Sequence, residues 1–146
     1  LVLRVGWAAA TGHVAVPALF LFAIIFFWTP PHFWALALVR LKDYTRAGVP
    51  MLPVVRGEEF TRGHIMLYAV ELVIVTLLLP MLRMAGSIFL VSALVLGGAL
   101  LYSAWKVWRQ GGNKVAWGMY RASSMYLAFL FIALMADALI RAPHIR

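Results

Sequence analysis

Cysteine is absent from this chain of 146 residues, and charged side chains are scarce. Without cysteine the chain can form neither a disulfide nor a thiolate metal site, so its redox compartment cannot be inferred. Only 12% of the residues are charged, against roughly 25% in an ordinary soluble domain. Acidic residues are the rarest of these, with five Asp and Glu against 13 Lys and Arg. So low a charge excludes an ordinary soluble domain.

Hydrophobic residues fill the space instead, at 64% of the chain with a mean hydropathy of +0.92. This composition indicates an integral membrane protein, and the length allows about four spans of ~20 residues. We therefore predict an all-α polytopic membrane bundle. Its four transmembrane helices are expected at residues 14–41, broken at 29–32, and at residues 65–82, 87–108 and 120–140.

The basic residues indicate how the bundle is oriented. They flank apolar runs instead of forming a stripe, so the net charge of +8 does not favour a nucleic-acid partner. The short connection at 83–86 makes its two helices antiparallel, which places the long connections at 40–64 and 109–119 on one side. Nine of the 13 Lys and Arg lie on that side, which is therefore expected to be cytoplasmic. Nearby aromatic residues resemble an interfacial belt: Trp105, Trp108, Trp117 and Tyr120.

Two prolines interrupt the first apolar run. Pro30 and Pro31 lack N–H groups and crowd the preceding turn, so we expect a broken helix whose freed carbonyls need protein or a cavity to satisfy them. His32 follows directly. Three roles are open for it: facing a porphyrin, carrying a proton, or capping the exposed carbonyls.

A cluster of charges follows the first span. If the helix continues, spacings of three place Arg40, Asp43 and Arg46 on one face. A carboxylate among cations suits a Mg²⁺-diphosphate, because Mg²⁺ takes one or two protein carboxylates plus phosphate oxygens, and Lys42 would neutralise further oxygens. An equally weighted alternative is an interfacial cluster that only sets topology. The apolar, proline-bounded stretch at 48–53 is either a lid or an ordinary turn.

Other polar residues fall inside the later spans. Glu71 would be costly in lipid, so it is expected to face the bundle interior and contact substrate or a cation. Asp137 is interpreted as structural, because Arg141 lies four residues later on the same helix face. Ala93 and Gly97 form a small-xxx-small pair that predicts close helix packing, and Gly98 would widen that surface.

Three sequence stretches carry a family resemblance. They are WTPPHFWALAL at 28–38, KDYTRAGVPMLPVVRG at 42–57 followed by Thr61, and GWAA with TG at 6–12. In this order they resemble the heme O synthase, or protoheme IX farnesyltransferase, family of the UbiA superfamily of intramembrane prenyltransferases. The likeness is densest from Gly6 to Thr61, whereas the later helices agree mainly in number and hydropathy.

The resemblance implies a nine-helix bundle in which residues 1–146 form the C-terminal portion of a single transmembrane prenyltransferase domain. It implies transfer of a farnesyl group from farnesyl diphosphate, held through Mg²⁺, to a vinyl group of heme B, giving heme O for heme–copper oxidases. Asp43 and Lys42 would be catalytic, with Asp43 holding the metal. The diphosphate would bind Arg40, Lys42 and Arg46, and the substrate cavity would include Trp28, His32, Trp34, Tyr44 and Glu71.

Two departures from the superfamily pattern stand out. Val39 and Ala47 occupy the positions four residues from Asp43, where a second aspartate would stand. The earlier Asn and Asp motif does not occur in the sequence either, so we expect the chain to be part of a longer protein and inactive alone. Alternatives are a UbiA-type enzyme with a quinone or chlorophyllide acceptor and a non-catalytic heme-binding membrane subunit. The expected location is a bacterial plasma membrane, or alternatively the mitochondrial inner membrane, with a heme A synthase as downstream partner.

Overall fold

The computed structural model describes residues 16–141, together with residues 10 and 12, so most of the GWAA and TG motif lies outside the described part. Over that part the chain is helical and contains no strand, as an all-α fold requires. The helices are α2 (Val16–Val39), α3 (Leu41–Ala47), α4 (Leu52–Arg56), α5 (Glu58–Met81), α6 (Ser87–Gln110) and α7 (Asn113–Arg141).

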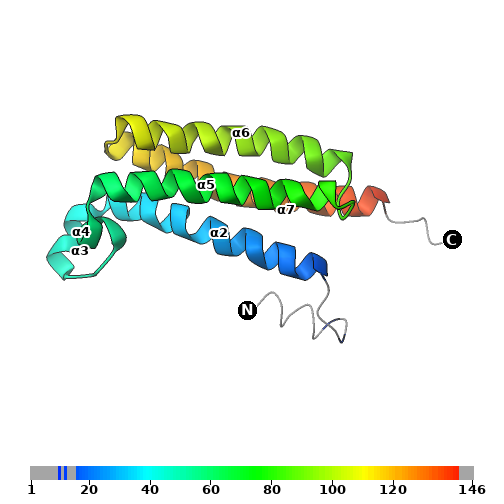
Figure 1. Cartoon of the computed structure of the whole chain (residues 1–146), viewed down its shortest axis with the longest axis horizontal. Helices are drawn as coiled ribbons and strands as arrows, with labels where there is room; N and C mark the ends of the chain where they lie inside the picture. Colours follow the sequence, from blue (N-terminus) through cyan, green and yellow to red (C-terminus); the bar gives the residue numbers. More distant parts are fainter. Residues whose placement is uncertain (1–9, 11, 13–15, 142–146) are drawn as a thin grey trace.

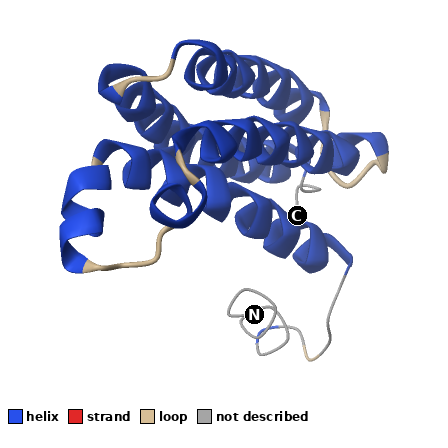
Figure 2. Ribbon diagram, turned by 60° about the vertical axis from the view of Figure 1, so that its left-hand side comes forward, coloured by secondary structure: helices blue, strands red, loops and turns tan. Residues whose placement is uncertain are grey.

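The four long helices form an up-and-down bundle, with α3 and α4 beside one end of it (Figures 1 and 2). α2 packs against α5 and α7, and α6 packs against the same two helices, so the four close into a ring. Each of α2, α5, α6 and α7 is long and apolar enough to cross a membrane, which confirms the four expected spans. The bundle thus has two polar ends, the α3–α4 end and the opposite end.

Small residues let the helices approach closely at the centre of the ring. Ala35, Ala69 and Ala93 are almost fully buried, and larger side chains such as Phe89 and Tyr126 fill the space between them. A Cβ on Gly97 would lie 3.2 Å from Val73 of α5, which confirms the predicted close packing there. Gly98, by contrast, faces open space and takes no part in the packing.

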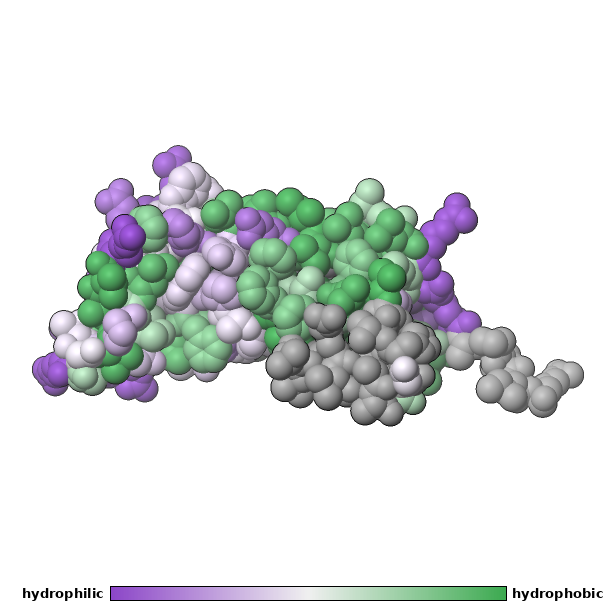
Figure 3. Space-filling model, turned by 60° about the horizontal axis from the view of Figure 1, so that its bottom comes forward, coloured by the Kyte–Doolittle hydropathy of each residue, from purple (hydrophilic) through white to green (hydrophobic). Residues whose placement is uncertain are grey.

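Apolar side chains also cover the outside of the bundle. Leu94 and Val95 of α6 and Ile132 and Met135 of α7 are all more than half exposed. Figure 3 shows green, hydrophobic surface along much of the bundle, most of the purple, hydrophilic side chains at its two ends, and one smaller purple patch between them. Such a surface suits lipid and would be poorly hydrated in water, in agreement with a membrane bundle.

The first span is a single helix through its prolines, which corrects the break expected at 29–32. Thr29 precedes Pro30 and keeps helical conformation, and its hydroxyl donates to the carbonyl of Ile25 at 2.7 Å. α5 and α7 enclose this stretch from two sides. Packing between neighbours and hydroxyl bonds of this kind allow proline inside membrane helices. The chain changes direction later, at Arg40, which separates α2 from α3.

Two later helices begin well before their apolar runs. α5 begins at Glu58, although hydropathy places the span from residue 65, and α7 begins at Asn113, although hydropathy places it from residue 120. The additional turns carry polar side chains at the α3–α4 end. They bring Glu58 and Asn113 close to the end of α2, where a groove opens.

Candidate functional site

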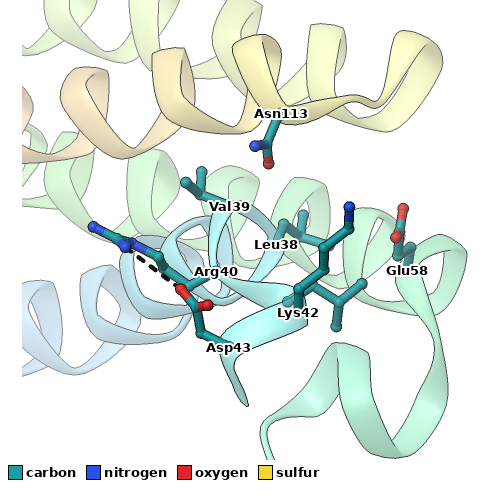
Figure 4. A pocket seen from close by; sticks show the side chains of 8 residues that line it. Leu38, Val39, Arg40, Lys42, Asp43, Glu58 and Asn113 are labelled. Atoms are coloured by element: carbon teal, nitrogen blue, oxygen red, sulfur yellow. Dashed lines mark hydrogen bonds and ion pairs between the residues drawn. The ribbon is translucent and has the colours of Figure 1, made fainter. Parts of the chain in front are cut away.

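A groove of about 540 Å³ opens at the α3–α4 end of the bundle, where α2 gives way to α3. Figure 4 shows side chains entering it from three directions: the α2–α3 junction, the first turn of α5 and the first turn of α7. Apolar residues form its inner side and charged residues its rim. The lining residues are Leu38, Val39, Arg40, Leu41, Lys42, Asp43, Glu58 and Asn113.

Asp43 lies in the first turn of α3 and pairs with Arg40. Arg40 Nη1 donates to Asp43 Oδ2 at 3.4 Å, and both side chains are 61% exposed. An ion pair this exposed contributes little free energy, because water competes for both partners. The carboxylate of Asp43 is therefore held only loosely and can exchange its partner.

Lys42 projects to the other side of the groove. In Figure 4 its ammonium extends toward Glu58, while the amide of Asn113 points into the groove from above. Lys42, Glu58 and Asn113 are all solvent-exposed. The rim thus presents cationic, anionic and amide groups to a single space, which suits a ligand that carries phosphate oxygens and a metal ion.

A smaller cavity of about 160 Å³ adjoins this groove and shares Leu38, Glu58 and Asn113 with it. Arg62 of α5 lies in its wall, and its Nε is buried without a hydrogen-bond partner among the described residues. Its guanidinium approaches Gly111, where a Cβ would clash with it and where φ is +65°. Glycine is therefore required at that position. Arg62 adds a further cation beside the groove.

Two members of the predicted charge cluster lie outside the groove. Arg46 is in the last turn of α3, where the helix dipole stabilises a cation. It does not line the groove. Tyr44 is half-buried and does not line it either. The stretch at 48–53 contributes no lining residue, and α3 ends there with Gly48 in the left-handed conformation at φ 67°. The structure therefore brings Asp43 together with Arg40 and Lys42.

The aromatic residues of α2 divide between two faces. His32 is sandwiched between Trp28, at 4.3 Å between ring centroids, and Tyr120 of α7, at 4.5 Å. Trp34 instead faces α5, with its ring perpendicular to that of Tyr68 at 5.2 Å. Tyr120 consequently packs inside this stack, whereas Trp105, Trp108 and Trp117 are exposed in the manner expected of a belt.

Hydrogen bonds fix the orientation of the His32 ring. The hydroxyl of Ser123 donates to the carbonyl of Tyr120 at 2.8 Å and lies 2.8 Å from His32 Nδ1. When the Ser123 hydroxyl proton points to that carbonyl, Nδ1–H is the donor to Ser123 and Nε2 carries the lone pair; this tautomer is an assignment from the hydrogen-bond pattern. Trp28 Nε1–H donates to the carbonyl of Ser123 at 2.8 Å. His32 and Trp28 together therefore fasten α2 to α7.

Glu71 lies on the α5 face that also carries Tyr68, one turn away. It is half-buried, and within residues 16–141 it forms neither an ion pair nor a hydrogen bond. It lies about two and a half turns farther along α5 than Arg62 and is not part of the groove. Glu71 and Asp43 thus belong to different regions of the structure.

The groove supplies part of what a divalent metal requires. Asp43 and Glu58 offer carboxylate oxygens and Asn113 an amide oxygen, which are the ligands that Mg²⁺ prefers. The described part of the chain has no cluster of three or more His, Asp or Glu side chains that could hold a metal alone. Asp43 and Glu58 border the groove from opposite sides (Figure 4), so Asp43 alone would offer a Mg²⁺ ion one carboxylate, and the other ligands would come from phosphates and water.

Glu58, Asn113 and Arg62 were not identified from the sequence as site residues. Two of them stand next to glycines, at Gly57-Glu58 and at Gly111-Gly112-Asn113. Glycine is an accepted N-cap residue and acidic residues are enriched in the first turn, so these glycines and the Glu58-Glu59 pair could have indicated the helix starts. Hydropathy alone could not, because these turns are polar.

Comparison with known families and proteins adds an independent result. The model of the UbiA prenyltransferase family matches residues 1–135. A protoheme IX farnesyltransferase of Chloroflexus aurantiacus is 54% identical over 136 residues, and that of a Roseiflexus species (strain RS-1) is 53% identical over 136 residues. Each alignment covers 93% of this chain. The protoheme IX farnesyltransferase of Bordetella pertussis is 52% identical over 132 residues, or 90% of this chain.

These relatives are much longer than this chain. The aligned region is 23% of the Chloroflexus protein, 26% of the Roseiflexus protein and 44% of the Bordetella protein. The chain therefore spans less than half the length of the relatives it matches. No solved structure matches it.

Proposed function

The chain belongs to the UbiA prenyltransferase family, and from this premise we propose that it contributes to the transfer of a farnesyl group from farnesyl diphosphate to a vinyl carbon of heme B. The product would be heme O. The proposal extends to a whole protein in which residues 1–146 form the C-terminal portion of the prenyltransferase domain. It is supported by the three relatives above, each of which is named protoheme IX farnesyltransferase.

One observation carries the proposal: the groove with Asp43, Arg40 and Lys42 on its rim opens where an apolar bundle meets its polar end. An allylic diphosphate has a charged head and a long apolar tail, so it needs charge recognition at such a boundary. The exposed Arg40–Asp43 pair can open to admit it, because the pair itself is weak.

In this mechanism the bond between farnesyl C1 and the diphosphate oxygen breaks, and the diphosphate leaves with the electron pair. Lys42 and Arg40 would stabilise the negative charge that develops on the leaving group. Arg62, beside the groove, is placed to add a third cation. Arg46 does not line the groove, so it would contact the diphosphate only from outside, in addition to Lys42 and Arg40.

Asp43 would hold Mg²⁺ at the rim, and phosphate oxygens and water would complete its coordination, while Glu58 and Asn113 offer polar groups elsewhere along the groove. When bound, the metal supplies positive charge that neutralises the departing diphosphate. The residues of this chain then have two tasks: Asp43 orients the metal-bound head group, and the apolar side chains of α2 keep water from the reacting carbon. The electrons of the heme vinyl group form the new carbon–carbon bond. The cation left on the porphyrin side is captured by water, which then loses a proton and becomes the hydroxyl group of heme O.

The aromatic residues are proposed to border the substrate cavity from two sides of α2, Trp28 and His32 from the side of α7 and Trp34 from the side of α5. Trp28, His32 and Trp34 lie on α2, and Tyr44 on α3 continues the same segment of chain. Aromatic ring faces can stabilise a passing allylic cation. Glu71 of α5 is proposed to face the substrate cavity of the whole protein at a point away from the groove, since a carboxylate facing lipid at that depth would be unfavourable.

A non-catalytic heme-binding subunit is the second candidate. It is favoured by the hydrogen bond between His32 Nδ1 and Ser123, because the tautomer assigned from it carries a lone pair on Nε2 that could ligate iron. Trp28 and Tyr120 cover both faces of the imidazole, however, so a porphyrin would have to approach its edge. Loss of a Soret signal in His32→Ala, without any prenylated product from the wild type, would favour this candidate.

The test uses the full-length protein in membranes supplied with heme B, farnesyl diphosphate and Mg²⁺, with heme O measured by mass spectrometry. We expect Asp43→Ala to abolish the product while membrane insertion is retained. Glu59→Ala is the matched control, because Glu59 is an exposed carboxylate at the same end that does not line the groove. Unchanged turnover in Asp43→Ala would remove Asp43 from the mechanism, and prenylation of a quinone precursor or chlorophyllide instead of heme B would change the acceptor.

The location is proposed on the same basis. Residues 40–64 and 109–119 would face the cytoplasm of a bacterial plasma membrane, or the corresponding side of the mitochondrial inner membrane, because they carry most of the cations. A heme A synthase that consumes heme O remains a predicted partner. A cysteine-accessibility experiment with single cysteines introduced at Arg46 and Arg83 would report their sides, since the chain has no native cysteine.

A further inference from the structure

A second groove, of about 580 Å³, lies at the same end of the bundle between the last turns of α6 and the first turns of α7. It shares no lining residue with the candidate site. Its charged and aromatic side chains are those of Lys106, Lys114, Arg121 and Trp117, and Gly118 also lines it. We refer to it as the α6–α7 groove.

The spacing of the polar residues explains how the groove forms. On α6, Ser103, Lys106 and Gln110 are three and four residues apart, and on α7 Lys114 and Arg121 are two turns apart, so each set occupies one helix face. The two helices are antiparallel neighbours, and both faces border the same groove. Gly118 leaves it hollow, because a Cβ there would meet nothing within 4 Å.

The charge of this groove is of one sign. Lys106, Lys114 and Arg121 line it, and no carboxylate does, whereas the candidate site mixes cations with Asp43 and Glu58. Lys114 is also the second residue of α7, where a cation opposes the helix dipole. Helix stability therefore does not account for this lysine; membrane orientation requires a cation at this end but not at this position, whereas a bound anion would favour this position.

A second, apolar groove of about 440 Å³ lies between the same two helices, farther from the polar end, with Val95 of α6 and Ile132 of α7 among its lining residues. Val95 precedes Lys106 by 11 residues and Ile132 follows Arg121 by 11, a spacing that returns to nearly the same helix face after three turns. That spacing is a rise of about 16 Å, close to half of the ~30 Å hydrocarbon thickness. The α6–α7 interface thus carries cations at its polar end and an apolar groove about three turns deeper along the same two helix faces.

We propose that the α6–α7 groove binds an anionic phospholipid, with the phosphate among Lys106, Lys114 and Arg121 and an acyl chain along the apolar groove. Basic pockets between transmembrane helices are suited to acidic lipid head groups. Trp117 borders the head-group pocket at the depth where tryptophan is enriched. A soluble phosphate would use the cations alone, whereas the apolar continuation serves only a lipid.

The proposal is tested with the delipidated full-length protein in neutral detergent, titrated with dioleoyl phosphatidylglycerol or dioleoyl phosphatidylcholine and followed by native mass spectrometry. We expect the wild type to prefer phosphatidylglycerol. The double variant Lys114→Gln with Arg121→Gln should bind it about tenfold more weakly or worse. Arg109→Gln is the matched control, because Arg109 is an exposed cation of α6 at the same end that does not line the groove.

A second variant removes no charge. Gly118→Leu fills the hollow and is favourable for helix formation, so it should fold and still lose binding about tenfold. Gly98→Leu is its control, because that glycine also faces open space but lines neither groove. Normal thermal unfolding of all four variants without lipid would establish that they are folded.

Three results would overturn the proposal. Equal binding of phosphatidylglycerol and phosphatidylcholine would show that charge is not recognised. An equal loss in Arg109→Gln would indicate a diffuse cationic surface instead of a site. Displacement of phosphatidylglycerol by millimolar inorganic phosphate or diphosphate would indicate a site for a soluble anion.

Discussion

Asp43 and Asp137 lie at opposite ends of the bundle, and each pairs with an arginine three or four residues away. The distances are similar, at 3.4 Å to Arg40 and 3.6 Å to Arg141. Their surroundings differ, because the side chain of Asp43 is 61% exposed and that of Asp137 only 4%. Burial, more than ion-pair distance, therefore separates a carboxylate that can bind a ligand from one that holds the fold.

Asp137 has further partners that Asp43 lacks. It accepts a hydrogen bond from the N–H of Gly86 at 2.7 Å and a long one from the N–H of Phe89 at 3.5 Å. Gly86 is the N-cap residue of α6 and has no side chain to cap the helix. The carboxylate of Asp137, near the end of α7, thus caps the N-terminus of α6. The positive end of the α6 dipole also stabilises its negative charge.

The largest effect is expected from Asp137→Ala, because it removes the cap of α6 and its charged hydrogen bonds together. The free energy of unfolding should fall by about 2–3 kcal/mol. Unfolding of the full-length protein by heat or denaturant in detergent would measure the loss. A decrease below about 0.5 kcal/mol would mean that this aspartate is no more structural than an exposed one.

The sequence predicted the Asp137–Arg141 pair, because it depends only on a spacing of four along one helix. It did not predict the bond to Gly86, which joins residues 51 positions apart through tertiary packing. The same limit applies to the candidate site. The Arg40–Asp43 pair could be predicted from its spacing of three residues along the chain. Glu58 and Asn113 could not, because they reach the groove from other helices.

The four spans were predictable because their apolar cores are long, but their polar ends were not. The proline pair was predicted to break α2, and this was wrong because neighbouring helices and the Thr29 hydroxyl support a continuous helix. Local propensity thus located the unusual segment without determining its conformation. Packing against α5 and α7 determined it.

An intermediate effect is expected from Gly86→Ala, which disturbs the Asp137 cap without removing it. A Cβ at this position would lie 2.5 Å from Asp137 Oδ1 and 2.9 Å from Arg141 Cδ, so both side chains must move. We expect a loss of about 1–2 kcal/mol in unfolding free energy. Gly98→Ala is the control and should be neutral or stabilising, since its site is open and helical. Equal stability of both variants would contradict the tight contact at Gly86.

The smallest effect on stability is expected at the other end of the comparison, from Asp43→Asn. The Arg40 pair is exposed, so its loss should change the unfolding free energy by less than about 0.5 kcal/mol. The same variant should nevertheless weaken Mg²⁺-dependent binding of farnesyl diphosphate by the full-length protein, because an amide is a poorer Mg²⁺ ligand than a carboxylate. Isothermal titration and thermal unfolding of one preparation would measure both quantities. A large loss of stability with unchanged diphosphate binding would reverse the roles of the two aspartates, because Asp43 would then hold the fold and the diphosphate site would lie elsewhere.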